Sequence, residues 1–209
     1  MERGAAAEGA PIQRAHSGGF FWTVNRSRRI QVILELAGRL PKLVIIAGSE
    51  SEAADVAERL TLRGLPVVLA ASIDGFQRAI GPDDWSGGAL VTTADYVADR
   101  GPIASPMTVH LRPPFSVRSY VKRLKFSISP VQLTFVTPEE VGRADELRAA
   151  VSPHLEVGKQ GVELDQLFDL SKSKKPAVVD APRRRFGFRQ ATSKTPDTQA
   201  VGMTTQVSQ

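Results

Sequence analysis

The chain has 209 residues, 42% of them hydrophobic, which is enough to bury one domain-sized core and still carry polar tails. It contains no cysteine, and this excludes disulfides and thiolate metal sites. His16, His110 and His154 are too far apart in sequence to suggest a metal centre. The net charge of +5 suits an anionic partner such as nucleic acid, although a basic tail alone would also account for it.

Nothing in the sequence indicates a membrane-bound or exported chain. No apolar run approaches the roughly 20 residues that a membrane-spanning helix needs. Residues 1–18 lack the continuous apolar stretch of a signal peptide, so we expect a cytoplasmic location. The same segment is rich in small residues and shows no apolar periodicity, and we predict that it is disordered.

Strand and helix patterns begin at residue 19. The aromatic run over 19–24 predicts a first strand. Asn25 or Ser27 is the expected cap of a helix whose apolar residues recur at three- and four-residue steps over 30–40. The continuous apolar run over 42–47 is typical of a parallel strand that is buried on both faces.

The alternation continues to about residue 151. Ser51 is the expected cap of a helix that ends before Gly64. Further elements are expected, in chain order, as a strand at 65–70, a short helix at 74–80, a strand at 89–93, a helical turn at 95–100, a strand at 107–111, a helix at 116–124 and a strand at 131–136. Thr137 and Glu140 form a capping box that opens a last helix. This order predicts an α/β fold, a parallel sheet with helices on both faces.

The pattern fails after residue 157, and we expect residues 158–209 to be a basic, mostly disordered tail. A short amphipathic segment interrupts it, with the apolar stripe Val162, Leu164, Leu167, Phe168 and Leu170. Basic clusters follow, and flexible clusters of this kind bind phosphates without sequence specificity.

Several segments, in the right order, resemble the C-terminal RecA-like domain of superfamily 2 helicases of the DEAD-box type. The matching segments are 42–49 (motif IV), Gln77 and Arg78 (the Q-x-x-R region), 90–101 (motif V), 119–123 (the start of motif VI) and 134–140 (the closing strand and helix). The resemblance implies one RecA-like domain over residues 19–157. No single motif is specific, but the ordered set is.

The sequence departs from the family pattern at the residues that bind ATP and support its hydrolysis. No G-x-x-x-x-G-K-[ST] segment occurs, so nothing in the sequence cradles the phosphates of ATP. Two arginine positions of motif VI are occupied by Phe126 and Ser129. The resemblance leaves Asp95, Arg100 and Arg123 as vestigial nucleotide-facing residues. We therefore expect no catalytic residues, no cofactor and no metal, with ATP binding only alongside a partner domain.

The positions that contact nucleic acid in the family are better preserved in this sequence. By resemblance, the residues expected to contact a nucleic acid are Ser49, Arg78, Thr92, Thr93 and Gly101. Lys122, in a basic patch on the predicted helix at 116–124, and Arg183, Arg184 and Arg185 of the tail are expected to join them. Hydroxyl, backbone and arginine contacts of this kind position a strand without reading its sequence. Ordinary strand-end, turn and surface roles remain open for each of them.

Three functions follow from this pattern. The first is RNA or DNA binding, with RNA favoured, by a degenerate helicase C-terminal domain that lacks its own ATP-hydrolysing half. The second is a protein-interaction module that regulates or completes a helicase or ribonucleoprotein, with the apolar stripe of residues 162–170 as its surface. The third is one subunit of a split motor whose partner chain supplies the first RecA-like domain. No membrane partner is expected.

Overall fold

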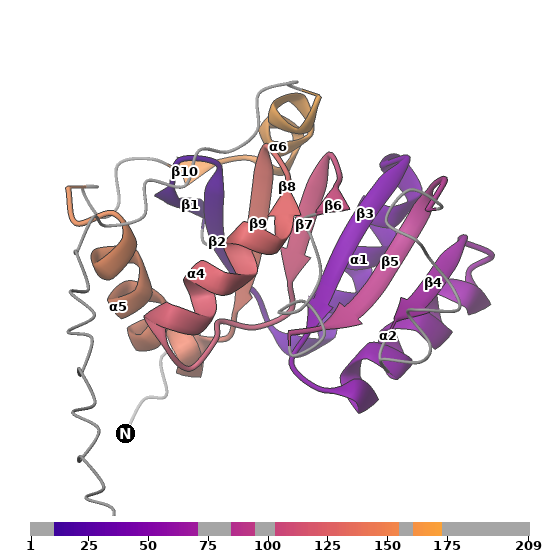
Figure 1. Ribbon diagram of the computed structural model, residues 1–209, viewed down its shortest axis with the longest axis horizontal. Coiled ribbons are helices and arrows are strands. Elements are labelled where there is room, and N and C mark those ends of the chain that lie inside the picture. The colour runs from indigo at the N-terminus through magenta and orange to yellow at the C-terminus, as the bar shows by residue number, and fades with distance from the viewer. Residues whose placement is uncertain (1–10, 71–84, 95–102, 155–160, 173–209) are drawn as a thin grey trace, which may run out of the picture.

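The computed structural model describes residues 11–70, 85–94, 103–154 and 161–172 (Figure 1). The main sheet has eight strands in the order β10-β1-β2-β9-β7-β3-β5-β4. Its strands are β1 (Ile12–His16), β2 (Gly19–Thr23), β3 (Lys42–Ala47), β4 (Val67–Ala70), β5 (Gly88–Thr93), β7 (Met107–His110), β9 (Val131–Val136) and β10 (Gly161–Val162). A second sheet pairs β6 (Ile103–Ala104) with β8 (Ser127–Ile128).

The middle of the main sheet is parallel. Six neighbouring strands run in the same direction, in the order β2-β9-β7-β3-β5-β4. In contrast, β1 is antiparallel to both β2 and β10. β3 lies at the centre, where Ile45 stands opposite Val91 of β5 and Val109 of β7. All three side chains are fully buried, as expected of strands covered on both faces. The predicted α/β fold class is confirmed.

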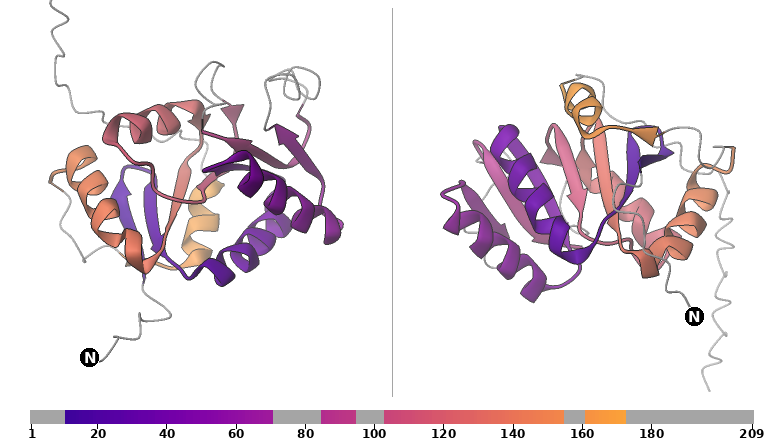
Figure 2. Two further views of the ribbon diagram at one scale, coloured as in Figure 1. Left: turned by 90° about the horizontal axis from the view of Figure 1, so that it is seen from below. Right: turned by 180° about the vertical axis from the view of Figure 1, so that it is seen from behind.

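Helices cover both faces of the sheet, as Figures 1 and 2 show. The helices are α1 (Arg26–Arg39), α2 (Glu50–Leu62), α4 (Val117–Phe126), α5 (Val141–Val151), which follows the 3-10 turn η2 (Pro138–Glu140), and α6 (Leu164–Ser171). One core joins α1, α2 and α6 to one face, and a second joins α4 and α5 to the other. Each helix therefore buries an apolar stripe against alternate residues of the strands.

The predicted helix ends are mostly confirmed. The Ser116 hydroxyl accepts the Ser119 backbone N–H at 3.2 Å and caps α4. Glu140 accepts the Thr137 backbone N–H at 3.0 Å in the predicted capping box. Gly64, at φ +69°, closes α2 as expected of a glycine after a helix.

The expected cap of α2 at Ser51 is wrong. The helix begins at Glu50, and Ser49 caps it by accepting the Glu52 backbone N–H at 3.2 Å. Ser49 has the extended backbone, with φ −153° and ψ 163°, that a capping residue needs. The acids at positions 50 and 52 then fall in the first turn, where the helix dipole favours negative charge.

The prediction of disorder before residue 18 is wrong for β1. Ile12 and Ala15 are buried, at 3% and 0% exposure, and β1 pairs with both β2 and β10. Its neighbours in space supply the order: Gln13 accepts a hydrogen bond from Arg148 of α5 at 2.8 Å. A five-residue strand of mixed polarity gives little periodic signal of its own, so sequence reasoning missed it.

The short amphipathic segment expected over 162–170 forms β10 and α6, but it belongs to the folded domain and not to a disordered tail. Leu167 and Phe168 are buried in the core at 0% and 5% exposure. Arg39 of α1 lies over the Phe168 ring at 3.5 Å from its centroid and pairs with Asp165 at 2.9 Å. The folded domain therefore reaches at least to Lys172, past the predicted boundary at residue 157. Residues 173–209 lie outside the described part of the chain.

Candidate nucleic-acid interface

The carboxyl ends of the parallel strands form the edge at which open α/β sheets bind ligands. Four connections meet there, each directly after a strand of the parallel sheet. They are residues 24–26 after β2, 48–50 after β3, 111–116 after β7 and 137–140 after β9. We call this set of connections, with the first turns of the helices that follow them, the carboxyl edge.

Positive charge concentrates in the first turn of α1. Arg26, Arg28 and Arg29 lie there, with no acid in that turn and no hydrogen bond from the side chain of the N-cap residue Asn25. The amino end of a helix already carries partial positive charge, so cations there are unfavourable and anions favourable. The start of α1 therefore has the electrostatics of an anion-binding position.

Arg29 is held inward while Arg26 and Arg28 remain exposed. Its Nη2 atom donates to Glu140 at 3.1 Å. Burial lowers the pKa of the Arg29 guanidinium, and the Glu140 carboxylate opposes that shift. The pair ties the start of α1 to the turn before α5.

A hollow of about 320 Å³ opens between the starts of α1 and α2. Arg26, Arg29 and Arg112 line it together with Glu52 and others. Arg112 donates to Glu52 at 2.8 Å, and this bond raises the pKa of Arg112. A side chain at Gly48 would meet Arg112, whose Nε lies 2.7 Å from the position of an added Cβ, so glycine permits this close packing.

An exposed aromatic ring lies on the connection between β7 and α4. Phe115 is 85% exposed, and the Arg143 guanidinium of α5 lies 4.6 Å from its ring centroid. Helix α4 begins just beyond it, and all its charged residues are basic. Arg118, Lys122 and Lys125 are exposed on that helix.

The hydroxyl residues predicted from motifs IV and V are buried or hydrogen-bonded within the fold. Ser49 is exposed, but its hydroxyl caps α2 by accepting the Glu52 backbone N–H. Thr92 is fully buried and donates to the Ala70 carbonyl at 3.0 Å. Thr93 is 6% exposed. The Thr92 hydroxyl therefore joins β5 to β4 and does not face solvent, contrary to the prediction that it contacts nucleic acid.

The motif VI segment divides into exposed and buried positions. Lys122 is exposed, as its predicted role requires. Arg123 is 9% exposed, and its Nη1 donates to the Arg112 carbonyl at 3.2 Å. Phe126 is buried in a core cluster, and Ser129 is buried among hydroxyls of β7 and β8. The two positions at which the resemblance expects arginines therefore hold neutral, buried side chains.

The other predicted site residues lie outside the described part of the chain. They are Arg78, Asp95, Arg100, Gly101, Arg183, Arg184 and Arg185. Their roles stay predictions.

Sequence reasoning missed most of the carboxyl edge. Arg26, Arg28, Arg112, Phe115 and Arg143 were not singled out, because none belongs to a helicase motif. One signal was available: the Arg-Ser-Arg-Arg run places cations where a helix begins, contrary to the usual preference for acids there. The contact between Phe115 and Arg143 joins residues far apart in sequence and needed the structure.

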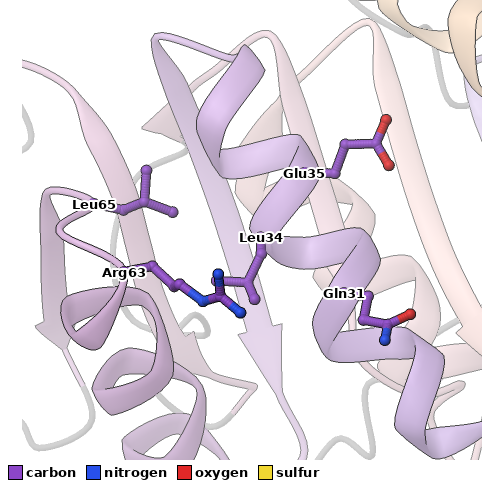
Figure 3. Close-up of a pocket in the computed structure, with 5 residues that line it drawn as sticks. All are labelled: Gln31, Leu34, Glu35, Arg63 and Leu65. Carbon is purple, nitrogen blue, oxygen red and sulfur yellow. The ribbon is translucent and has the colours of Figure 1, made fainter.

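A second hollow lies between the middle of α1 and the residues that follow the end of α2. Figure 3 shows its lining of Gln31, Leu34, Glu35, Arg63 and Leu65. Its volume is about 410 Å³, and it combines two leucines with charged groups. Leu62, at the end of α2, is 78% exposed.

A buried histidine lies between the sheet and α4. His110 is fully buried, and its ring centroid is 6.4 Å from that of Tyr120. Burial, followed by the nearby positive charge of Arg123, lowers the pKa of His110 to about 3. The ring is therefore neutral at neutral pH. Within the described residues, no group of three or more acids and histidines could hold a metal ion.

The stripe expected to serve a protein-interaction module is used inside the domain. Leu167 and Phe168 belong to the main core, and Val162 and Leu164 pack against it. Only Leu170 of the stripe counts among the exposed large hydrophobic residues, at 43%. The stripe therefore holds α6 on the sheet and is not a free surface. No helix in the described residues is long and apolar enough to cross a membrane.

Comparison with known proteins identifies the fold. Neither a protein-family model nor a curated protein matches the sequence. Among solved structures, the S. cerevisiae Dbp5 C-terminal domain bound to Gle1 and IP6 matches with a TM-score of 0.55 and 17% identity, over 75% of this chain and 96% of that one. The E. coli DEAD-box protein SrmB bound to RraA matches with a TM-score of 0.53 and 12% identity, over 78% and 98%.

A third structure, S. cerevisiae Dbp5 bound to RNA and ADP BeF3, matches with a TM-score of 0.56 and 16% identity, over 68% of this chain and 40% of that one. The chain spans less than half of the longer Dbp5 chains that it matches. The likeness establishes the fold: this is a RecA-like α/β domain of the kind found at the C-terminus of DEAD-box helicases.

Proposed function

We propose that this chain binds single-stranded RNA along the carboxyl edge and does not hydrolyse ATP by itself. The observation that carries the proposal is the first turn of α1, with three arginines, no acid and no side-chain cap. Phosphate groups of a nucleic acid would neutralise the exposed charges of Arg26 and Arg28 and occupy the end of the helix that favours anions.

The neighbouring connections support the same role. Arg112 after β7 and the basic residues of α4 add positive charge around the same part of the fold. Contacts of this kind hold the sugar–phosphate backbone and carry little sequence information. The fold likeness to Dbp5, one structure of which is described as bound to RNA, favours RNA over DNA as the target. The proposed location is the cytoplasm.

The sequence and structure of this chain also support the proposal that it does not hydrolyse ATP by itself. The sequence contains no phosphate-binding loop of the G-x-x-x-x-G-K-[ST] type. At the positions matching two family arginines, Phe126 and Ser129 are buried, at 3% and 1% exposure, and neither can stabilise charge on a phosphoryl group. ATP would bind only if a partner supplied a first RecA-like domain.

Fluorescence anisotropy tests the proposal. A labelled single-stranded RNA and the matching DNA are titrated with the full chain and with a 1–172 truncation, at two salt concentrations. We expect the truncation to retain most of the affinity and both proteins to bind more weakly at high salt. Binding that disappears with residues 173–209, or binding indifferent to salt, would contradict a site on the folded domain.

A second function, docking of a protein partner, is favoured by one observation. The hollow in Figure 3 places Leu34 and Leu65 beside the charged groups of Glu35 and Arg63, and mixed surfaces of this kind are common at protein interfaces. Such a partner could be a helicase or another protein that supplies a first RecA-like domain. This function predicts weak RNA binding that does not respond to substitutions at the start of α1.

A further inference from the structure

Phe115 is a large apolar side chain left in solvent. It is 85% exposed, on the connection between β7 and α4, whereas the other eight phenylalanines of the chain include five that are buried in the described cores. An exposed phenylalanine beside charged residues has no role in the core of the domain. A single exposed apolar side chain is common on protein surfaces, so the groups around this ring decide what it can bind.

The ring is not isolated, because Arg143 lies against it. The Arg143 guanidinium carbon is 4.6 Å from the ring centroid, within the range of a cation–π contact. Phe115 lies on the connection after β7, and Arg143 lies in the first turn of α5, which follows β9 and η2. Phenylalanine rings and guanidinium planes are the groups on which unpaired bases stack in nucleic-acid complexes.

An ion pair connects the element that carries Arg143 to the arginines of α1. Arg143 lies one turn beyond Glu140, and Glu140 accepts a hydrogen bond from Arg29 at 3.1 Å. Arg26 lies one turn before Arg29 and also acts on the nearby Glu139, whose pKa is lowered chiefly by its Thr137 hydrogen bond and more weakly by Arg26. The Arg29–Glu140 ion pair therefore links the element that carries Arg143 to the start of α1.

The surroundings of the ring favour a nucleic acid over a protein. The exposed side chains that follow it into α4 are Ser116, Arg118 and Ser119, none of them apolar. Val141, at 37%, is the only other exposed large hydrophobic residue on the neighbouring turn of α5 in the described structure. The core of a protein interface is more apolar than the rest of the surface, whereas the residues around this ring are mainly polar and charged.

We infer that Phe115 and Arg143 form a stacking platform for one unpaired base of a single-stranded nucleic acid whose phosphates bind at the start of α1. This inference rests on the proposed function and deepens it, since it assigns a base contact to a site otherwise built for the backbone. Stacking tolerates every base, so the platform adds affinity without sequence preference.

The test uses the full chain and a short RNA carrying 2-aminopurine, whose fluorescence falls when it stacks. We expect saturating protein to quench the probe, and Phe115→Leu to abolish the quenching and weaken binding by roughly 5- to 150-fold. Phe115→Trp restores both. The matched control is Leu62→Ala on α2, another exposed apolar side chain at 78% exposure, which changes neither readout.

The outcomes separate this inference from the proposed function. Salt-dependent binding without quenching, at equal affinity for wild type and Phe115→Leu, would overturn the platform and leave backbone binding intact. An RNA with abasic sites that binds as tightly as the intact strand would also overturn it. Wild-type protein that binds no strand at either salt concentration would overturn the proposed function itself.

Discussion

The arginines at the start of α1 predict that binding and stability oppose one another. Arg28 is exposed in the first turn, which contains no acid. A cation there is unfavourable by roughly 0.3–1 kcal/mol, and an anion is favourable by a similar amount. Arginine, glutamine and glutamate have similar helix propensities, so substitutions among them isolate the effect of charge. Arg28→Gln should therefore stabilise the domain by up to about 1 kcal/mol, and Arg28→Glu by about twice as much.

Urea unfolding followed by circular dichroism measures the stability. In thermal melts, each kcal/mol corresponds to a shift of roughly 2–4 °C for a chain of this size. The same variants should bind RNA more weakly. Loss of one phosphate contact should reduce the slope of log K against log salt by about 0.7 for a single strand.

A charge reversal at the C-terminal end of a helix is the control, because its effect on stability should have the opposite sign. Arg63 is the C-cap residue of α2, where a cation is favourable, and it is exposed. Arg63→Glu removes a favourable cation and adds an unfavourable anion, so it should lower stability by about 0.6–2 kcal/mol and leave RNA affinity unchanged. If Arg28→Glu also destabilises the domain, or if both substitutions affect RNA equally, the reasoning about the start of α1 is refuted.

Three further predictions concern the fold. His110 is neutral in the folded state, with a pKa of about 3 against the ordinary 6.5, so the unfolded chain binds more protons between those values. The stability that His110 contributes is complete above pH 6.5 and should fall by about 1.4 kcal/mol per pH unit as the pH drops toward 3. His110→Leu should flatten that part of the pH dependence in urea titrations. Phe168→Ala should cost about 3 kcal/mol and release α6, seen as rapid hydrogen exchange over residues 164–171; slow exchange there would contradict its anchoring role. Deletion of residues 1–18 removes β1 and should lower the melting temperature, whereas deletion of 1–10 should not; equal melting of the two proteins would contradict the placement of β1.

The central part of the fold could be predicted because burial on both faces leaves a simple pattern. Continuous apolar strands such as 42–47 and capping residues such as Ser116 and Thr137 gave elements at nearly the observed positions. The order of the elements and the spacing of weak motifs together indicated the RecA-like fold. These signals are local, so they survive without knowledge of the tertiary structure.

The edges of the domain could not be predicted in the same way. β1 and α6 are stabilised by contacts with distant residues, such as Arg148 with Gln13 and Arg39 with Phe168. The prediction of site residues had a related limit: Thr92 matched a motif, but its hydroxyl donates a hydrogen bond to a neighbouring strand. Motif matching locates an edge of the sheet, whereas burial decides which of its side chains can meet a ligand.

The most direct test of an RNA site on the carboxyl edge is to map binding by amide chemical shifts. A uniformly labelled full chain, with assigned backbone resonances, is titrated with single-stranded RNA at low salt. We predict that the largest shifts cluster at residues 25–29, 111–119 and 139–143, and that they shrink when salt is added. Shifts confined to the hollow around Leu34 and Leu65, or scattered over the domain without saturation, would contradict an RNA site at the carboxyl edge.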